Sequence, residues 1–554
     1  MAIDLPPALP PQAADSALIR ETKAADSSYI GGKLGNVEVR VFGNRSLDQE
    51  TILSVIANAS APSEVVKDLT RAYYDAGFLW VKLFYYRVED IVGVIVSQSV
   101  VSEVRGDERI TPHFESLVGD ADPTLAEYDT ARVLAALKSE RIGENYTVTY
   151  EDLGNQQLAV VLESSADEDY DNTDYIFELN NKGSRYLGRY FGLAGLQHRT
   201  DSGTKWSFAY QRAFIEWGES LDGEKLNQYS LSVDHPFSFG LYGIDLSYVE
   251  YERDPEGQLV QPGSCSLLFF CTGPTVSSTR LDVQAEIQRF GVRGQQVIYS
   301  DTQQRLRLKE RVEYVDSYIE ENNSDTILID ERYPVAEVGV LYNSRFQNDR
   351  SSFNAGLDAR VGLSSSGTLD TYDEYRRAFL AQNPSASEAP DVAPAARSGE
   401  FVTLQPSVNY QYALSPRTVF SATLKGQYAN EQVPEQEQFV LGGMDSLGAY
   451  LPGILIGDEG FHLKLEVSRS LSWKGVTFRP ALFIEQGQTW YNNTDGDLGD
   501  AQKVADAGFA LSMNFGHGLE SHWVVARNVS DDVIDEALLE ASEADFFWRL
   551  RLTL

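Results

Sequence analysis

The sequence predicts two small α/β domains followed by an antiparallel β-barrel of 16 strands that crosses a membrane. Three observations lead to this fold class. The first third of the chain repeats one order of strand-like and helix-like segments, and from about residue 174 onward apolar and polar residues alternate in short segments. The connections between those segments are alternately short and long.

The composition excludes several classes of function. With 554 residues the chain is too long for one compact domain. Its net charge of −36 argues against nucleic acid as a partner, since phosphates require a basic surface. No apolar run approaches the roughly 20 residues that a membrane-spanning helix needs, whereas barrel strands turn only alternate residues to lipid. The six histidines lack metal-ligand spacing and no catalytic motif occurs, so we expect neither an enzyme nor a metal or cofactor.

Residues 1–35 are rich in Pro, Ala, Gly and Ser, and we expect a tail that could hold a short plug helix and a linker. The first α/β domain is expected at 36–99, where apolar residues alternate from Val37 to Val41 in a strand. Ser46 and Gln49 predict a capping box before a helix, and an apolar stripe predicts a second helix near 63–76. Strands are expected near 79–87 and 91–100.

The same order repeats in a second domain, expected at 100–166. A strand near 100–105 is followed by a short helix after Thr111-Pro112. Asp122 and Pro123 predict the start of a longer helix, and strands near 146–150 and 157–162 complete the unit. We therefore expect each domain to be a three-stranded sheet covered by two helices.

The helix-to-strand turn of the first domain contains Tyr74, Gly77 and Phe78 in the order Tyr-x-x-Gly-Phe. Together with the duplicated topology, this turn resembles the polypeptide-transport-associated (POTRA) domain; the alternative is two generic α/β folds. The resemblance implies a sheet edge that receives an extended peptide through main-chain hydrogen bonds.

The barrel is predicted from segments in which every second residue is apolar, such as 229–233, 242–248 and 461–467. This period places one face against lipid and the other toward the lumen, although a soluble sandwich also alternates. The expected strands are 174–181, 187–198, 204–215, 226–236, 240–251, 278–291, 295–319, 331–346, 351–363, 400–413, 418–429, 460–471, 476–490, 503–515, 520–529 and 546–554.

The lengths of the connections favour the barrel over the sandwich. They are tight after even-numbered strands, at 200–203, 347–350, 415–417 and 472–475, and mostly long after odd-numbered ones, at 252–277, 364–399, 430–459, 491–502 and 530–545. Outer-membrane barrels have short turns on one rim and long loops on the other. The 29 Tyr, 26 Phe and 7 Trp suffice for two aromatic girdles. Cys265 and Cys271, in a long loop, are expected to form a disulfide, the alternative being two free thiols.

Two POTRA modules before a 16-stranded barrel at 167–554 resemble the transporter (TpsB) of two-partner secretion systems, of the haemolysin and filamentous-haemagglutinin transporter type. The motif residues are Asn181, Gly183, Arg185 and Gly188 in the first hairpin; Gly442, Gly443, Asp445, Ser446, Gly448, Tyr450, Gly457, Asp458 and Gly460 in a latch loop; and Phe483, Glu485 and Gly487 on the inner wall. The resemblance implies that the loop 430–460 folds into the lumen, with Glu485 as the acidic partner of its Arg.

The latch departs from the family pattern. Where the family has Arg-Gly, this chain has Gly448-Ala449, and no Arg or Lys lies between Lys425 and Lys464. A buried Glu485 must then find another donor, take a proton or face water. The chain also ends in Leu, where an aromatic residue is usual in the family.

The resemblance implies a monomer in the outer membrane of a Gram-negative bacterium, surrounded by outer-membrane lipids, with its N-terminal domains in the periplasm. The expected partner is a secreted polypeptide (TpsA-like) that the POTRA domains capture unfolded and that passes through the barrel to the cell surface. The alternatives are a factor that inserts other outer-membrane proteins, and a channel or scaffold relative that has lost the latch Arg.

Overall fold

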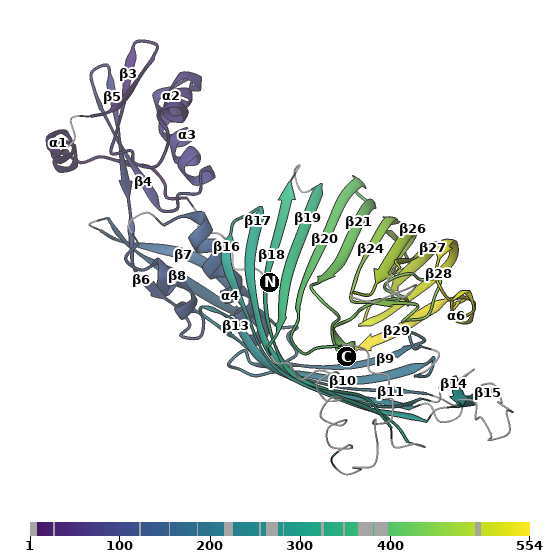
Figure 1. The fold of residues 1–554 in the computed structure, drawn as a ribbon. Coiled ribbons are helices and arrows are strands. Elements are labelled where there is room, and N and C mark those ends of the chain that lie inside the picture. The colour runs from purple at the N-terminus through teal and green to yellow at the C-terminus, as the bar shows by residue number, and fades with distance from the viewer. Residues whose placement is uncertain are drawn as a thin grey trace, which may run out of the picture.

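The computed structural model places two α/β sheets at one end of a closed β-barrel (Figure 1). It describes residues 8–554 except 26–27, 121–122, 155, 185–186, 215–224, 254–255, 262–274, 281, 323–325, 347–349, 364–380, 382–396 and 493–499. In this described part, no helix has both the length and the apolar character to cross a membrane. Arg185 and the expected disulfide between Cys265 and Cys271 lie outside the described residues.

The first α/β domain contains a five-stranded sheet in the order β1-β4-β5-β3-β2. Its strands are β1 (Gln12–Ala13), β2 (Ile30–Leu34), β3 (Val37–Phe42), β4 (Val81–Val88) and β5 (Ile91–Gln98). The helices α2 (Gln49–Asn58) and α3 (Pro62–Asp75) cover one face, where Val39, Ile52 and Leu69 are fully buried in a common core.

Two expectations for this domain were wrong. Residues 12–34 are no free tail, because β1, α1 (Ser16–Ala25) and β2 all belong to the first domain, which therefore has five strands instead of three. A turn at Gly35, whose φ is +61°, folds β2 back onto β3 in five antiparallel pairs. The cap of α2 is Asp48, which accepts from Thr51 N at 2.8 Å, in place of the predicted capping box at Ser46.

The second α/β domain has the predicted three strands, in the order β6-β8-β7. The elements are β6 (Val100–Arg105), η1 (Thr111–Leu117), α4 (Leu125–Ile142), β7 (Glu144–Gly154) and β8 (Gln157–Ala166). The start of α4 differs from the prediction, because its capping box is formed by Thr124 and Glu127 instead of beginning at Asp122. The helix ends at Gly143, whose φ of +68° favours glycine.

The barrel closes as predicted, with 16 antiparallel strands along its circumference in the described chain. They are β9 (Thr173–Asn180), β10 (Phe191–Arg199), β11 (Lys205–Ala213), β12 (Lys225–Phe237), β13 (Gly240–Arg253), β16 (Val283–Ser300), β17 (Gln304–Glu321), β18 (Thr326–Phe346), β19 (Ser351–Gly362), β20 (Val402–Ser415), β21 (Thr418–Ala429), β24 (Glu459–Arg469) continued by β25 (Leu471–Trp473), β26 (Val476–Trp490), β27 (Gln502–Asn514), β28 (Leu519–Asp532) and β29 (Phe547–Thr553). The last strand, β29, pairs with the first, β9, over five residues.

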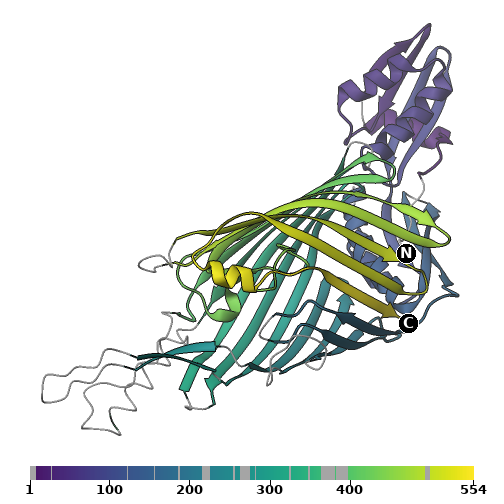
Figure 2. The same ribbon diagram turned by 90° about the vertical axis from the view of Figure 1, so that its right-hand side faces the viewer.

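The predicted alternation of faces is confirmed in β26. Leu482 and Ile484 expose 67% and 49% of their surfaces on the outer face, whereas Phe483 and Glu485 expose 5% and 2%. The two ends of the barrel also differ, as Figures 1 and 2 both show: the α/β domains lie at one end, and α6 (Glu536–Ala541) with the hairpin of β14 (Glu256–Gln261) and β15 (Thr275–Arg280) at the other.

One turn lies nine residues from its expected position. The expected strands 278–291 and 295–319 placed it near Gly291 and Gly294, but β16 continues to Ser300 and the turn is at 301–303. Asp301 makes this turn by accepting from Gln303 N and Gln304 N, each at 2.7 Å. The two glycines instead leave room for side chains of neighbouring strands. A Cβ at Gly294, for example, would lie 2.5 Å from the Tyr242 ring.

Candidate functional site

Residues 430–458, which join β21 to β24, form an inner loop that packs inside the barrel. The loop contains η2 (Glu435–Glu437), β22 (Phe439–Leu441) and β23 (Leu455–Gly457). Its Leu447 and Tyr450 are fully buried in one apolar cluster with Phe483, Val524 and Phe547, which come from β26, β28 and β29. The inner loop therefore covers the last strands of the barrel from within.

The tip of the inner loop depends on its two glycines. Gly442 and Gly443 have φ values of +117° and +94°, and a Cβ at Gly442 would lie 2.3 Å from the Leu451 carbonyl oxygen. Gly443 N donates to the Tyr450 carbonyl at 2.8 Å, and Gly442 N donates to Ser446 Oγ at 3.1 Å. Because these bonds close the tip on itself, it meets the wall as a preformed unit.

The first anchor of the inner loop to the wall consists of two buried carboxylates. Gly448 N donates to Glu485 Oε1 at 2.9 Å, and Ala449 N donates to Asp506 Oδ2 at 2.8 Å. Two consecutive main-chain N–H groups thus stand where the family has Arg. A larger residue has little space here, since a Cβ at Gly448 would be 3.0 Å from Val524.

On the wall, Lys464 supplies a positive charge that the loop lacks, and His462 makes a further polar contact. His462 Nε2 lies 2.8 Å from Glu485 Oε2, and Lys464 Nζ lies 3.8 Å from the same oxygen. Both residues are on β24, the strand next to β26. Glu485 therefore finds other donors, which was the first of the three outcomes that its burial allowed.

In a second anchor, which the sequence did not indicate, the loop supplies the carboxylate and the wall supplies the donor. Glu437 of the inner loop accepts from Arg360 Nε at 2.9 Å and from its second terminal nitrogen at 3.1 Å. Arg360, on β19, also contacts Glu313 and, at 2.5 Å, Glu337. Glu437 and Arg360 expose 5% and 9% of their surfaces, so this ion pair is screened little by water.

The second anchor is one end of a longer row of ion pairs on the inner wall, called here the charge row. Its members, in contact order, are Arg141, Asp234, Arg293, Asp245, Arg311, Glu313, Arg360 and Glu437. The charge row begins on α4 of the second α/β domain, follows five barrel strands and ends on the inner loop. It joins the domain outside the barrel to the loop inside it.

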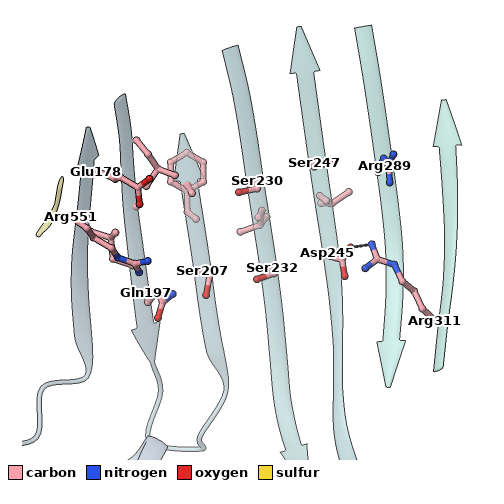
Figure 3. A pocket seen from close by; sticks show the side chains of 17 residues that line it. Glu178, Gln197, Ser207, Ser230, Ser232, Asp245, Ser247, Arg289, Arg311 and Arg551 are labelled. Carbon is pink, nitrogen blue, oxygen red and sulfur yellow. Dashed lines mark hydrogen bonds and ion pairs between the residues drawn. The ribbon is translucent and has the colours of Figure 1, made fainter. Parts of the chain in front are cut away.

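The side of the lumen along β9–β13, β16 and β17 holds a cavity of about 400 Å³, whose lining combines polar side chains such as Ser207 and Asp245 with apolar ones. Figure 3 shows Ser207, Ser230, Ser232 and Ser247 on neighbouring strands, with Arg311 bonded to Asp245 beside them. Small hydroxyl side chains leave the backbone wall accessible and offer rotatable donors and acceptors. Such a surface can contact an extended polypeptide without selecting its sequence.

The second α/β domain is docked on the short-turn rim of the barrel. Arg141 of α4 pairs with Asp234 at 2.5 Å and donates to the Gly203 carbonyl at 3.3 Å. Ser300 Oγ donates to Asp129 of α4. His113 is buried near Lys138 of this contact, and desolvation lowers the pKa of His113 to about 4, so it stays neutral at neutral pH. Arg141 and Asp234 are almost fully buried, so the orientation of the domain is fixed by charge as well as by shape.

The predicted hairpin residues lie at the closure of the barrel. Asn181 accepts from Trp548 N at 2.6 Å and donates to the Phe546 carbonyl at 3.0 Å, which ties β9 to the start of β29. Gly183 and Gly188 approach so closely that a Cβ on Gly183 would lie 1.8 Å from the Gly188 oxygen. This hairpin is far in sequence from the inner loop but touches it, since Lys182 Nζ lies 3.3 Å from Asp445.

The remaining motif residues shape the ends of the inner loop and the joint between the α/β domains. Asp458 accepts from Val433 N at 3.0 Å and from Asn492 N at 2.9 Å. Three further motif glycines are closely packed, namely Gly457, Gly460 and Gly487. At each of them an added Cβ would lie within 2.6 Å of a neighbouring atom. In the Tyr74–Phe78 turn, Gly77 has a φ of +89°, and its carbonyl accepts from Leu125 N of α4 at 2.5 Å.

Comparison with known proteins agrees with this architecture. Residues 274–515 match the model of the haemolysin secretion/activation protein family ShlB/FhaC/HecB. CdiB from Escherichia coli has a similar fold, with a TM-score of 0.68 and 14% identity over 93% of this chain and 90% of that chain. CdiB from Acinetobacter baumannii gives a TM-score of 0.61 and 12% identity over 96% and 91% of the two chains. No curated protein matches by sequence.

The fold is that of a 16-stranded β-barrel of the outer-membrane type that is preceded by two α/β domains of the POTRA type. Within that class, residues 274–515 are similar to the haemolysin secretion/activation protein family, and the fold of the whole chain is similar to that of the two CdiB proteins.

Proposed function

We propose that the chain exports an unfolded partner polypeptide from the periplasm to the cell surface along the polar side of its lumen. The α/β domains lie in the periplasm and capture the partner by adding its extended segments to their sheet edges. The inner loop closes the lumen at rest and withdraws from the charge row when the partner enters.

The observation that carries this proposal is the division of the lumen into two unlike sides. The inner loop packs on β26, β28 and β29 through apolar side chains. The side along β9–β13, β16 and β17 turns polar side chains such as Ser207, Ser232 and Asp245 to the lumen and has the cavity of about 400 Å³. The α/β domain docks on β12 and β16, strands of that polar side. A captured chain is thus delivered to the side that can accept it.

The two anchors explain how the inner loop can stay bound to the barrel wall at rest and still leave it when the partner enters. Both anchors are polar. In the first, main-chain N–H groups donate to carboxylates, and in the second, Glu437 pairs with Arg360. When Glu437 leaves, Arg360 keeps Glu313 and Glu337, so the wall is not left with an uncompensated buried cation. This arrangement lowers the cost of opening.

Removal of the two α/β domains tests the capture step. A chain without residues 8–166 is expected to abolish the appearance of the partner in the culture medium, because the barrel alone has no strand edge to receive it. The proteins of the medium and of the outer membrane are compared with those of cells that carry the full chain. A heat-modifiable barrel band verifies that the truncated barrel has folded.

Two outcomes would contradict the proposal. Unchanged secretion by the folded truncated barrel would remove the capture role. An unchanged medium from cells with and without the full chain, together with loss of other barrel proteins from the outer membrane, would favour an insertion factor instead.

A further inference from the structure

The outer face of the barrel has a groove where the sheet closes on itself. At this seam β29 pairs with β9 over five residues, and β10 and β11 follow beside them (Figure 1). The groove has a volume of about 520 Å³. Its apolar lining includes Phe177, Leu179, Ala194, Tyr210, Leu550 and Leu552. Phe177, Leu179 and Leu550 are exposed, so the groove opens toward the membrane.

Small residues of β10 form the floor of this groove. Ala194 is the register partner of Phe177 on one side and of Tyr210 on the other. Gly192, two residues earlier on the same face, stands beside Leu179. Two small residues between large apolar neighbours leave a hollow that runs along the strand. A hollow of this shape fits a single extended hydrocarbon chain.

A row of tyrosines marks how deep the groove lies in the membrane. Tyr210, Tyr229 and Tyr248 are register partners on β11, β12 and β13. Their ring centres are 4.9 Å apart in the first pair and 6.3 Å apart in the second. Rows of this kind are typical of the boundary between hydrocarbon and lipid headgroups. The next row on the same face is polar and consists of Arg212, Asn227 and Glu250.

Arg212 therefore lies at the level of the lipid headgroups, at one end of the groove. Its strand, β11, begins at Lys205 beside the turn of Gly203, where Arg141 of α4 is bound. Arg212 is the last residue but one of β11. It belongs to the leaflet away from the α/β domains, which the proposed function makes the outer leaflet.

The charge of Arg212 is not compensated by the protein. Two other cations at this end of the outer face are paired, Lys225 with Glu252 at 2.5 Å and Arg332 with Asp330 at 3.1 Å. Arg212 is exposed and makes no ion pair or side-chain hydrogen bond within the described residues. A guanidinium at headgroup level favours a phosphate group, which it can bind through two parallel hydrogen bonds.

We propose that the groove is a binding site for an acidic, phosphate-bearing lipid of the outer leaflet. The phosphate binds Arg212, and one acyl chain lies along Gly192 and Ala194 between β9 and β11. Because the groove reaches Leu550 and Leu552 of β29, the bound lipid contacts both sides of the seam. This inference goes beyond the proposed function, since the lipid binds whether or not a partner polypeptide is exported.

Native mass spectrometry of the purified full chain tests the charge preference. The probes are dioleoyl phosphatidylglycerol and dioleoyl phosphatidylcholine, which have the same acyl chains but differ in net charge. The wild type is expected to bind one molecule of the anionic lipid at least about tenfold more tightly than the zwitterionic one. Arg212→Gln is expected to reduce this ratio to about one, because it removes the charge that distinguishes the two headgroups.

Lys225→Gln is the matched control for charge, since Lys225 lies on the same outer face but is already paired with Glu252. The control is expected to keep the preference of the wild type. Heat-modifiable migration verifies that each variant has a folded barrel. A wild type without preference, or an Arg212→Gln chain that keeps it, would overturn the proposal.

Filling the groove tests the site of the acyl chain. Ala194→Trp is expected to lower the affinity for both lipids by at least about tenfold, because the indole takes the place of the chain. Ala422→Trp is the control, since Ala422 pairs with the exposed Leu465 on a distant part of the outer wall. Equal affinities of these two variants would contradict the groove as the binding site.

Inorganic phosphate separates a lipid site from a simple anion site. Millimolar phosphate is expected to leave the bound phosphatidylglycerol in place, because the acyl chain supplies most of the apolar contact. Displacement of the lipid by inorganic phosphate would show that Arg212 binds the phosphate group alone, and would refute the lipid site.

Discussion

Glu437→Gln is expected to hold the pore open. The substitution keeps the size of the side chain but removes the charge that binds the inner loop to Arg360. A hydrogen bond to a charged group is worth about 1.5–3 kcal/mol, and a loss of about 1.5 kcal/mol would shift the balance of closed and open loops by roughly tenfold. The wall stays intact, because Arg360 keeps Glu313 and Glu337.

Single-channel conductance in planar bilayers measures this effect. Glu431→Gln is the matched control, since it removes the same charge from the same loop at a residue whose carboxylate accepts from the neighbouring Asn430 side chain. The control is expected to behave like the wild type. A Glu437→Gln channel with wild-type conductance and open time would show that the second anchor does not keep the loop closed.

Arg141→Ala is expected to uncouple the second α/β domain from the barrel and to lower secretion by at least about tenfold. Arg141 supplies the ion pair to Asp234 and the bond to the Gly203 carbonyl that hold α4 on the rim. In its absence Asp234 would keep only the longer contact to Arg293, at 3.2 Å. The domain would then take many orientations instead of one.

The distance between spin labels on the two parts measures this loss of order. Labels at Ser164→Cys in β8 and Arg417→Cys on the short-turn rim, with Ser at positions 265 and 271, are expected to give one narrow distribution in the wild type. In the Arg141→Ala chain the distribution is expected to broaden. Glu140→Ala, an exposed neighbour on α4, serves as control. A narrow distribution in Arg141→Ala would refute the role of this ion pair.

Most of the barrel could be predicted because each strand shows its own alternation of apolar and polar residues. Each strand must turn alternate residues to lipid and lumen, so a period of two marks every strand and also the inward direction of Phe483 and Glu485. The one displaced turn shows the limit of this argument. The expected strands ended at Gly291 and resumed after Gly294, but both glycines lie within one strand and make room for the side chains of Arg311 and Tyr242. Close packing and turns both require glycine, and one sequence does not separate them.

The N-terminal segment was misjudged for a similar reason. The strand β2 contains Gly31 and Gly32, residues with low strand propensity, and β1 has only two residues. Both strands form because neighbouring strands pair with them, which is a tertiary effect. The residue pattern of 1–35 does not indicate this pairing.

The anchors of the inner loop show which part of a site depends on long-range contacts. The inward position of Glu485 followed from the alternation of faces and from the family resemblance. The donors of the first anchor did not, because Gly448 and Ala449 donate from their main-chain N–H groups, which no residue type in the sequence reveals. Arg360 and Glu437 are 77 residues apart. Each appears in the sequence as one of many charged residues, and only the closed barrel brings them together.

Photo-crosslinking from one pair of neighbouring positions on β11 tests the path of the polypeptide through the lumen. A benzoylphenylalanine replaces Ser207, which lines the cavity, or Trp206, which is 47% exposed on the lipid face. During secretion, we expect a crosslink to the partner polypeptide from position 207 and none from position 206. A crosslink from position 206 but not 207 would show that the polypeptide does not pass along the polar side of the lumen.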